Sequence, residues 1–120
     1  MNDRRTCRSD NHNTALRYQL ECTLRQGRMA ALALTDDAGV LLAWAGEDGI
    51  CHELGAIAPM LAQGWPTQEQ TQAIQKQDVS VRFIECFGEQ LVLASLGGGV
   101  AREALLAHSA RGIHRILTAN

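Results

Sequence analysis

The chain has 120 residues, of which 46% are hydrophobic, and a formal net charge of -2, which fits a single domain with one core and excludes a strongly basic nucleic-acid-binding protein. The longest apolar run, residues 40–45, is far shorter than the roughly 18 residues of a membrane span, and the polar start predicts neither a signal peptide nor an anchor. With four irregularly spaced cysteines, we expect a cytoplasmic protein whose thiols are reduced.

Charge is distributed unevenly along the chain. Residues 1–28 contain six arginines and three acidic residues, whereas residues 36–89 contain nine acidic residues, one lysine and one arginine. Residues 102–115 are basic again, with three arginines and one glutamate. If both basic ends share one face of the fold, the molecule has two surfaces of opposite sign, which favours oriented protein contacts. The alternative is charge that serves solubility alone.

The beginning of the chain predicts an arm followed by a helix. Residues 1–12 show no periodicity and are expected to form a flexible arm, so that the domain covers residues 13–120. Leucines then recur at every fourth residue from Leu16 to Leu24, a spacing typical of one face of a helix. We expect this helix to end near Gly27.

Two apolar runs after this helix predict a β-hairpin. They cover residues 29–35 and 40–45, and the turn between them carries Gly39, which can adopt a positive φ angle. Both runs are apolar on both sides. We therefore expect a sheet that is covered by other elements on both faces.

A second helix is predicted to begin at Asp48 or Gly49 and to end before residues 64–66. Apolar residues spaced four, three and four apart predict its buried stripe: Ile50, Leu54, Ile57 and Leu61. Residues 67–78 are rich in glutamine and predict no clear element.

A second hairpin and a last helix complete the prediction. Alternating residues predict a strand over 79–87, and a two-residue turn at Gly88-Glu89 of type II′ leads into a strand over 90–96. After three glycines the last helix follows, with its stripe of Leu106, Ala110, Ile113 and Leu117. The fold class is therefore α/β of the α+β kind, with a central antiparallel sheet of four or five strands and helices on both faces.

No catalytic, metal or cofactor site is predicted. Gly97-Gly98-Gly99 follows a strand and opens a helix, but the rest of a dinucleotide fingerprint is missing. Cys51, His52 and Glu53 are adjacent on a helix, so their side chains point about 100° apart and cannot converge on one metal or proton. We expect a protein that is not an enzyme and binds no cofactor.

The second helix instead suggests a protein interface. It has a row of small residues, Gly55, Ala58 and Ala62, and a further row beyond the stripe. One side can lie on the sheet while the other contacts a second chain, because small residues let helices approach and methionine adapts to irregular surfaces. The residues predicted to form this dimer or partner interface are His52, Glu53, Ala56, Pro59 and Met60.

The order of elements and three segments resemble the roadblock/dynein light chain family, over about residues 14–117. The segments are the hairpin over 31–43 with its "G-V-L-L-A" sequence, the small-residue helix over 53–58, and residues 90–96 leading into the last helix. Among its members, the chain looks most like the bacterial Mgl-type regulators of gliding motility and cell polarity.

The resemblance implies a non-catalytic, dimeric adaptor. Members of the family form homodimers or heterodimers through the second helix and the neighbouring strand, and they bind small Ras-like GTPases or one another. We therefore expect three partners: a second copy of this chain, another roadblock protein and a Ras-like GTPase complex. The first and last helices would cover the opposite face, which would place the arginine-rich helices on one surface and the acidic region on the other.

Two alternatives remain open. One is direct control of GTP hydrolysis, and the other is a small-molecule sensor of profilin-like or PAS-like build, with a pocket between the sheet and the second helix near Trp44 and Trp65. One departure from the family also matters: the glutamine-rich residues 67–77 stand where the family has its third strand, and they contain few β-branched or aromatic residues. The chain therefore either lacks this strand or uses the segment as a short helix.

Overall fold

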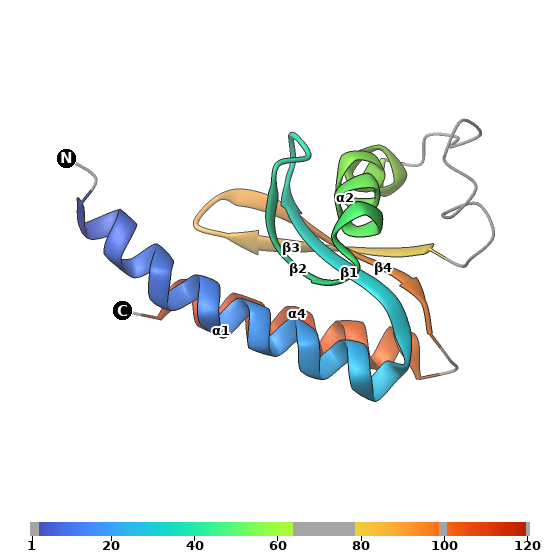
Figure 1. The fold of residues 1–120 in the computed structure, drawn as a ribbon. Helices are drawn as coiled ribbons and strands as arrows, with labels where there is room; N and C mark the ends of the chain where they lie inside the picture. The colour runs from blue at the N-terminus through green and yellow to red at the C-terminus, as the bar shows by residue number, and fades with distance from the viewer. Residues whose placement is uncertain (1–2, 64–78, 99–100, 120) are drawn as a thin grey trace.

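The computed structural model describes residues 3–63, 79–98 and 101–119, with side chains from residue 13 onward. These residues form three helices and four strands (Figure 1). In chain order they are α1 (Asp3–Gly27), β1 (Met29–Asp36), β2 (Leu41–Gly46), α2 (Asp48–Ala62), β3 (Val79–Cys86), β4 (Glu89–Gly97) and α4 (Arg102–Thr118).

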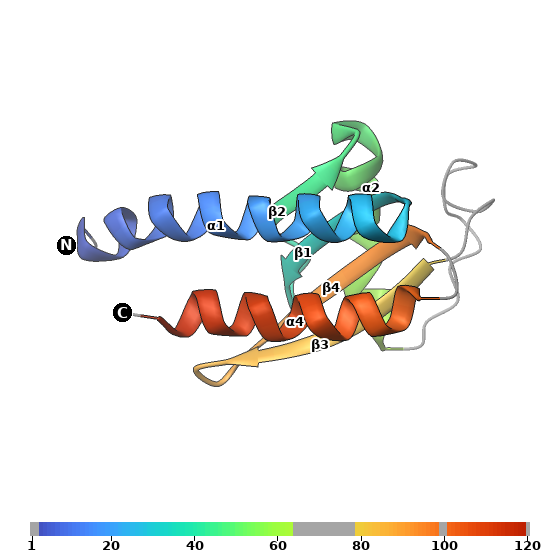
Figure 2. The ribbon, with the colours of Figure 1, turned by 90° about the horizontal axis from the view of Figure 1, so that it is seen from below.

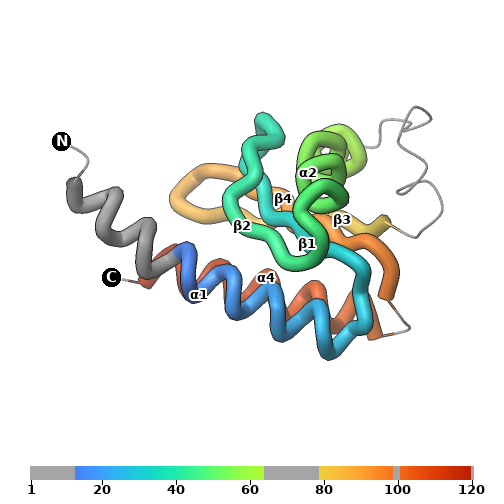
Figure 3. Tube along the Cα trace, in the orientation of Figure 1, coloured from blue at the N-terminus to red at the C-terminus, as the bar shows by residue number. Residues whose placement is uncertain are grey.

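The strands form one antiparallel sheet in the order β2-β1-β4-β3. Helix α2 lies on one face of the sheet, and α1 and α4 lie on the other (Figures 1 and 3). Seen from below, α1 and α4 run side by side and form one layer (Figure 2). The predicted α+β fold, with an antiparallel sheet and helices on both faces, is confirmed.

Each face of the sheet has its own buried cluster, because successive side chains of a strand point to opposite faces. The cluster under α1 and α4 is built chiefly of large residues, most of them leucines, while β2 contributes only Ala43 and Ala45. The cluster under α2 is built of smaller ones: Ala31, Ala33, Cys51, Leu54, Ala58, Val92, Ala94 and Leu96. Alanines therefore let α2 approach the sheet closely.

Helix α1 begins earlier than the sequence predicted. It starts at Asp3, so residues 3–12 are helical and the expectation that they lack regular structure is wrong. Apolar spacing did not predict this start because these residues carry no apolar stripe. A helix that is held by the buried Leu16 and Leu20 extends at little cost once its first turn exists. The division into an arm of residues 1–12 and a domain of residues 13–120 remains a prediction, because helical backbone does not report on mobility.

The turn between β3 and β4 also differs from the prediction. Cys86 pairs with Glu89, so Phe87 and Gly88 form the two-residue turn in place of Gly88 and Glu89. Their φ angles are 52° and 81°. Two positive φ angles are typical of type I′, not of the expected type II′.

The last helix, α4, contains a glycine that allows close packing. Gly112 is buried, and a Cβ atom added there would lie 2.6 Å from Gln19 Oε1 of α1. The residue that weakens the isolated helix thus lets α1 and α4 lie close together. The glutamine-rich residues 67–77, where a fifth strand was in question, lie outside the described residues.

Candidate functional site

Helix α2 begins at a well-defined cap. Glu47 has extended backbone angles, and its Oε1 accepts a hydrogen bond of 3.1 Å from the backbone N–H of Ile50. Asp48 follows in the first turn, where a carboxylate is favoured by the helix dipole. The predicted start of the helix is confirmed.

One side of α2 is buried against the sheet. This side consists of Cys51, Leu54, Gly55 and Ala58. The predicted stripe is only partly correct, because Leu54 is fully buried while Ile50, Ile57 and Leu61 are half-buried. The helix is rotated toward its small residues because the sheet face below it is lined with alanines.

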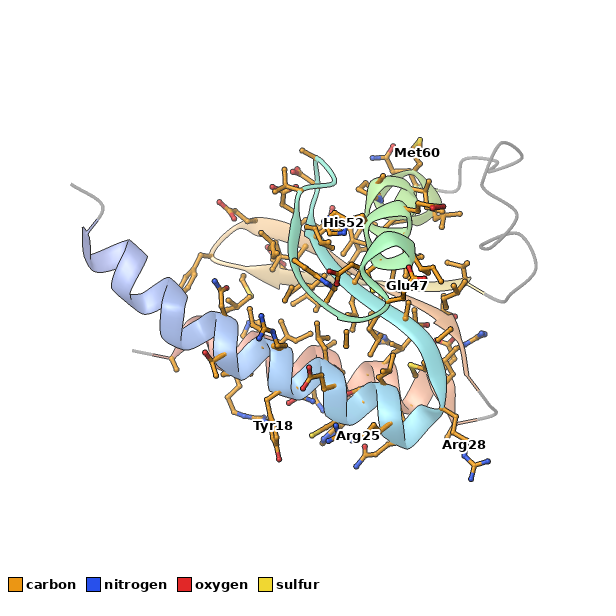
Figure 4. All side chains as sticks on the ribbon, in the orientation of Figure 1. Tyr18, Arg25, Arg28, Glu47, His52 and Met60 are labelled. Atoms are coloured by element: carbon orange, nitrogen blue, oxygen red, sulfur yellow. The ribbon has the colours of Figure 1, made fainter. Side chains whose placement is uncertain are left out.

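The five predicted interface residues lie outside the side of α2 that is buried against the sheet, although one carboxylate oxygen of Glu53 is itself buried. We call them the outer α2 surface: His52, Glu53, Ala56, Pro59 and Met60. Three are exposed, including Met60 at 40%, and two are half-buried. Figure 4 shows His52 and Met60 on the side of the molecule opposite α1. Their role as an interface remains a proposal.

His52 is held in place by a polar contact and an aromatic neighbour. Its Nδ1 lies 2.8 Å from the carbonyl oxygen of Asp48, which can only accept a hydrogen bond, so Nδ1 carries the proton. Its ring lies 5.1 Å from the Trp44 ring in an edge-to-face arrangement, and Trp44 Nε1 donates to Asp48 Oδ1 at 2.8 Å. His52 is therefore pre-positioned and loses little freedom when a partner binds.

Pro59 joins α2 to the β1–β2 turn. A Cβ atom on Gly39 would lie 3.8 Å from Pro59 Cγ and 3.7 Å from the Gly55 carbonyl oxygen. Proline has no N–H, so this carbonyl does not receive the usual helical bond from residue 59. The adjacent Val40 is 56% exposed. The predicted second strand, over residues 40–45, included Val40, whereas β2 begins at Leu41 and leaves Val40 in the turn.

Charge is distributed unevenly over the two sides of the molecule. Exposed arginines occupy the α1–α4 layer, at Arg17, Arg25, Arg111 and Arg115. Figure 4 shows Arg25 and Arg28 on the side away from Glu47 and His52. The carboxylates near α2 are Asp36, Asp37, Glu47, Asp48 and Glu53. Glu85 points to the same face of the sheet, whereas Glu89 pairs with Cys86 and points to the α1–α4 face. Arginines are thus concentrated in the α1–α4 layer, although Glu21 and Glu103 also lie there, and a role for the uneven charge stays a prediction.

The cysteines in the described part of the chain do not form a nucleophilic site. Cys51 is fully buried, and its sulfur lies 3.2 Å from the Ala45 carbonyl oxygen. Burial raises the pKa of the Cys51 thiol. Burial likewise raises the pKa of Cys86, and the carboxylates of Glu85 and Glu89 raise it further.

These thiols should therefore react slowly in the folded protein. A raised pKa lowers the thiolate fraction at a given pH, and only the thiolate reacts. Under alkylation near neutral pH, followed by peptide mapping, we expect the half-exposed Cys22 to be labelled about tenfold faster than Cys51 or Cys86. Denatured protein is the control, in which the three should react alike. Equal rates in the folded protein would contradict the buried placement.

A hollow in the described surface lies beside Trp44, but on the α1 side of the sheet and not between the sheet and α2, where the sensor alternative expects a pocket. It has a volume of about 420 Å³ and lies between α1 and β2, lined by residues that include Arg17, Glu21 and Trp44. Trp65 lies outside the described residues. Within the described ranges, His, Cys, Asp and Glu side chains do not gather in threes that could hold a metal ion, and no helix is long and apolar enough to cross a membrane.

The comparisons with known proteins agree on the fold. No protein-family model matches the chain, and no curated protein matches its sequence. Among solved structures, MglB of Myxococcus xanthus is similar over 87% of this chain and 88% of its own, with a TM-score of 0.57 and 15% identity. The gliding protein MglB of Thermus thermophilus is similar over 88% of this chain and 90% of its own, with a TM-score of 0.56 and 16% identity.

A third structure, described as MglB with tetrameric arrangement, is similar over 88% of this chain and 89% of its own. Its TM-score is 0.61 and its identity is 19%. At such identities the likeness concerns the fold. The described residues therefore adopt an MglB-like roadblock fold, which confirms the fold that the sequence resemblance implied.

Proposed function

We propose that this protein is a non-catalytic, dimeric adaptor of the cytoplasm that regulates gliding motility or cell polarity. It dimerises through the outer α2 surface and binds another roadblock protein or a small Ras-like GTPase complex. The observation that carries the proposal is that α2 leaves His52, Ala56 and Met60 exposed on the side away from its buried residues, so that a small and a flexible apolar residue face solvent.

The exposed residues Ala56 and Met60 suit a helix–helix contact. Alanine lets a second helix approach closely, and methionine adapts to its side chains. Their exposure in the single chain, with Met60 at 40%, leaves apolar area that a partner helix would remove from water. His52, held by Asp48 and Trp44, supplies a pre-positioned polar group at the same surface.

The solved structures with the same fold support the proposal by their descriptions. One is a gliding protein and another has a tetrameric arrangement of MglB. A motility role and self-association are therefore the functions we carry over to this chain as hypotheses. The uneven charge adds support, because surfaces of opposite sign favour oriented contacts with other proteins.

Replacing Ala56 by glutamate is expected to break the dimer while the domain stays folded. A buried, unpaired carboxylate in the contact costs several kcal/mol, whereas at an exposed position of the free chain it costs about 0.5 kcal/mol or less. Light scattering after size exclusion should show the dimer mass for the wild type and half of it for the variant. Circular dichroism should give a nearly unchanged Tm.

Ala104→Glu is the matched control, because Ala104 is exposed on α4 at the opposite side of the molecule. It should leave the dimer intact. Purified roadblock proteins and Ras-like GTPases from the same genome are then mixed with each variant, and a gain in mass that Ala56→Glu abolishes supports the adaptor role. A monomeric wild type, or equal dimerisation of both variants, would refute the α2 interface.

A further inference from the structure

The β3–β4 turn carries an aromatic residue that the fold does not explain. Phe87 has a φ angle of 52°, a conformation rare for bulky residues, in a turn type that favours asparagine and glycine. Its side chain is 76% exposed, so it is not required for the core. A residue that strains its backbone and buries little surface indicates a use outside the folded domain.

The neighbours of Phe87 give this hairpin end a distinct chemistry. Phe83, which precedes it on β3, is 47% exposed. Glu85 and Glu89 are exposed on either side of the turn, and no arginine or lysine lies between Phe83 and Glu89. We call Phe83, Glu85, Phe87 and Glu89 the hairpin end. Figure 1 shows this end of the sheet extending beyond α2.

Aromatic rings flanked by carboxylates match a surface of arginines. Each carboxylate can pair with a guanidinium, and a ring can stack on the flat face of another. Negative charge at the hairpin end disfavours an acidic or membrane surface as its partner, because anionic headgroups would repel both glutamates.

This chain carries a surface of the required kind. The α1–α4 layer exposes Arg25, Arg28, Arg111 and Arg115, and none of these four forms an ion pair with another described residue. Tyr18 is also exposed there, at 67%. Figure 4 shows Tyr18 and Arg25 on the side of α1 that faces away from the sheet, and Arg28 just beyond the end of the helix.

We propose that the hairpin end of one copy docks on the α1–α4 layer of a second copy. Charge complementarity selects the second copy, because one chain carries both halves of the contact. The two halves are different surfaces, so the contact is head-to-tail and propagates from copy to copy unless it closes into a ring. It does not use the outer α2 surface, and so it goes beyond the proposed dimer and joins copies into larger assemblies.

The contact is tested by sedimentation velocity over a range of protein concentrations, at about 50 mM and about 500 mM salt. The Ala56→Glu background is used beside the wild type, so that the α2 dimer and the head-to-tail contact are measured separately. We expect the average mass to rise with protein concentration in both the wild type and the Ala56→Glu variant, and to fall at high salt. A protein whose mass is independent of concentration in both backgrounds would overturn the proposal while leaving the α2 dimer untouched.

Phe87→Asn has two expected effects of opposite sign. Asparagine tolerates the positive φ angle, so the Tm should rise by about 3 °C. Association should weaken about tenfold, because the ring is lost. A fall in Tm, or unchanged association, would show that Phe87 serves the fold alone and would overturn the proposal.

Mixing variants identifies the second half of the contact. The double variant Arg111→Glu and Arg115→Glu should abolish binding of the hairpin end to the α1–α4 layer. Arg25→Glu serves as a second layer variant if the double variant does not fold. When the Phe87→Asn and layer variants are mixed in the Ala56→Glu background, one intact hairpin end meets one intact layer. The expected result is two-copy complexes and nothing larger; failure of the mixture to associate would refute docking on this layer.

Discussion

Replacing Gly46 by alanine is expected to destabilise the domain by about 3 kcal/mol or more. Gly46 ends β2 with a φ angle of 116°, a conformation that side chains rarely allow. A Cβ atom would lie 2.7 Å from the Ala30 carbonyl oxygen and 3.1 Å from the Ala31 Cα. Both are backbone atoms at β1, which cannot move without disturbing the pairing of the two strands. Urea or thermal unfolding should show a fall in Tm of about 10 °C.

Gly112→Ala is the control for this prediction. Its Cβ atom would also meet a neighbour, at 2.6 Å, but that neighbour is the end of the flexible Gln19 side chain. The helix gains about 1 kcal/mol from alanine in place of glycine, which offsets the cost of moving Gln19. We expect a free energy of unfolding within about 1 kcal/mol of the wild type. Equal losses for the two variants would contradict the backbone contact at Gly46.

The sequence predicted every described strand and the start of α2 because their signals are local. Apolar runs ended by Gly39, Gly64 and the glycines after β4 leave few alternatives for where elements begin and end. The start of α1 is not a local property of this kind. Residues 3–12 lack an apolar stripe, and their helical state follows from the packed turns that come after them.

The inward side of α2 could not be predicted because it depends on the sheet. Ile50, Ile57 and Leu61 are the most apolar choice, yet Gly55 and Ala58 face the sheet because Ala31, Ala33 and Ala94 lie opposite. Because the small residues of α2 face the sheet, the residues of the outer α2 surface stay on another side of the helix, as the sequence predicted. Packing on the sheet therefore changed which residues of the predicted stripe are fully buried, but it did not change the position of the outer α2 surface.

The exposed aromatics were missed for a different reason. Strand alternation treats Phe83 as an inward residue, but α2 does not extend over that part of the sheet, and the residue is 47% exposed. Phe87 was placed within the strand, although its position beside Gly88 and between two glutamates was a readable signal for a turn. A turn assignment that began one residue earlier would have identified an exposed phenylalanine in a type I′ turn.

Leu54→Ala should produce the second large loss of stability, about 3–5 kcal/mol. Leu54 is fully buried and is the largest side chain that α2 places on the sheet. The cluster that Leu54 shares includes Ala31, Ala33, Ala58 and Ala94, whose side chains are too short to relax into the space left by a truncated leucine. The cost of such a cavity grows with the volume that stays empty, so this position lies at the upper end of the range.

Leu106→Ala is the matched comparison, because Leu106 is equally buried in the cluster under α1 and α4. That cluster is rich in leucines, whose long side chains can shift toward a gap, so the expected loss is about 2–3 kcal/mol. Denaturant unfolding of both variants measures the difference. A larger loss for Leu106→Ala would mean that α2 moves to close the cavity, and a mobile α2 would be a poor platform for the proposed dimer. A larger loss for Leu54→Ala would show that the alanine-lined face holds α2 rigidly, with His52, Ala56 and Met60 in a fixed arrangement for a partner.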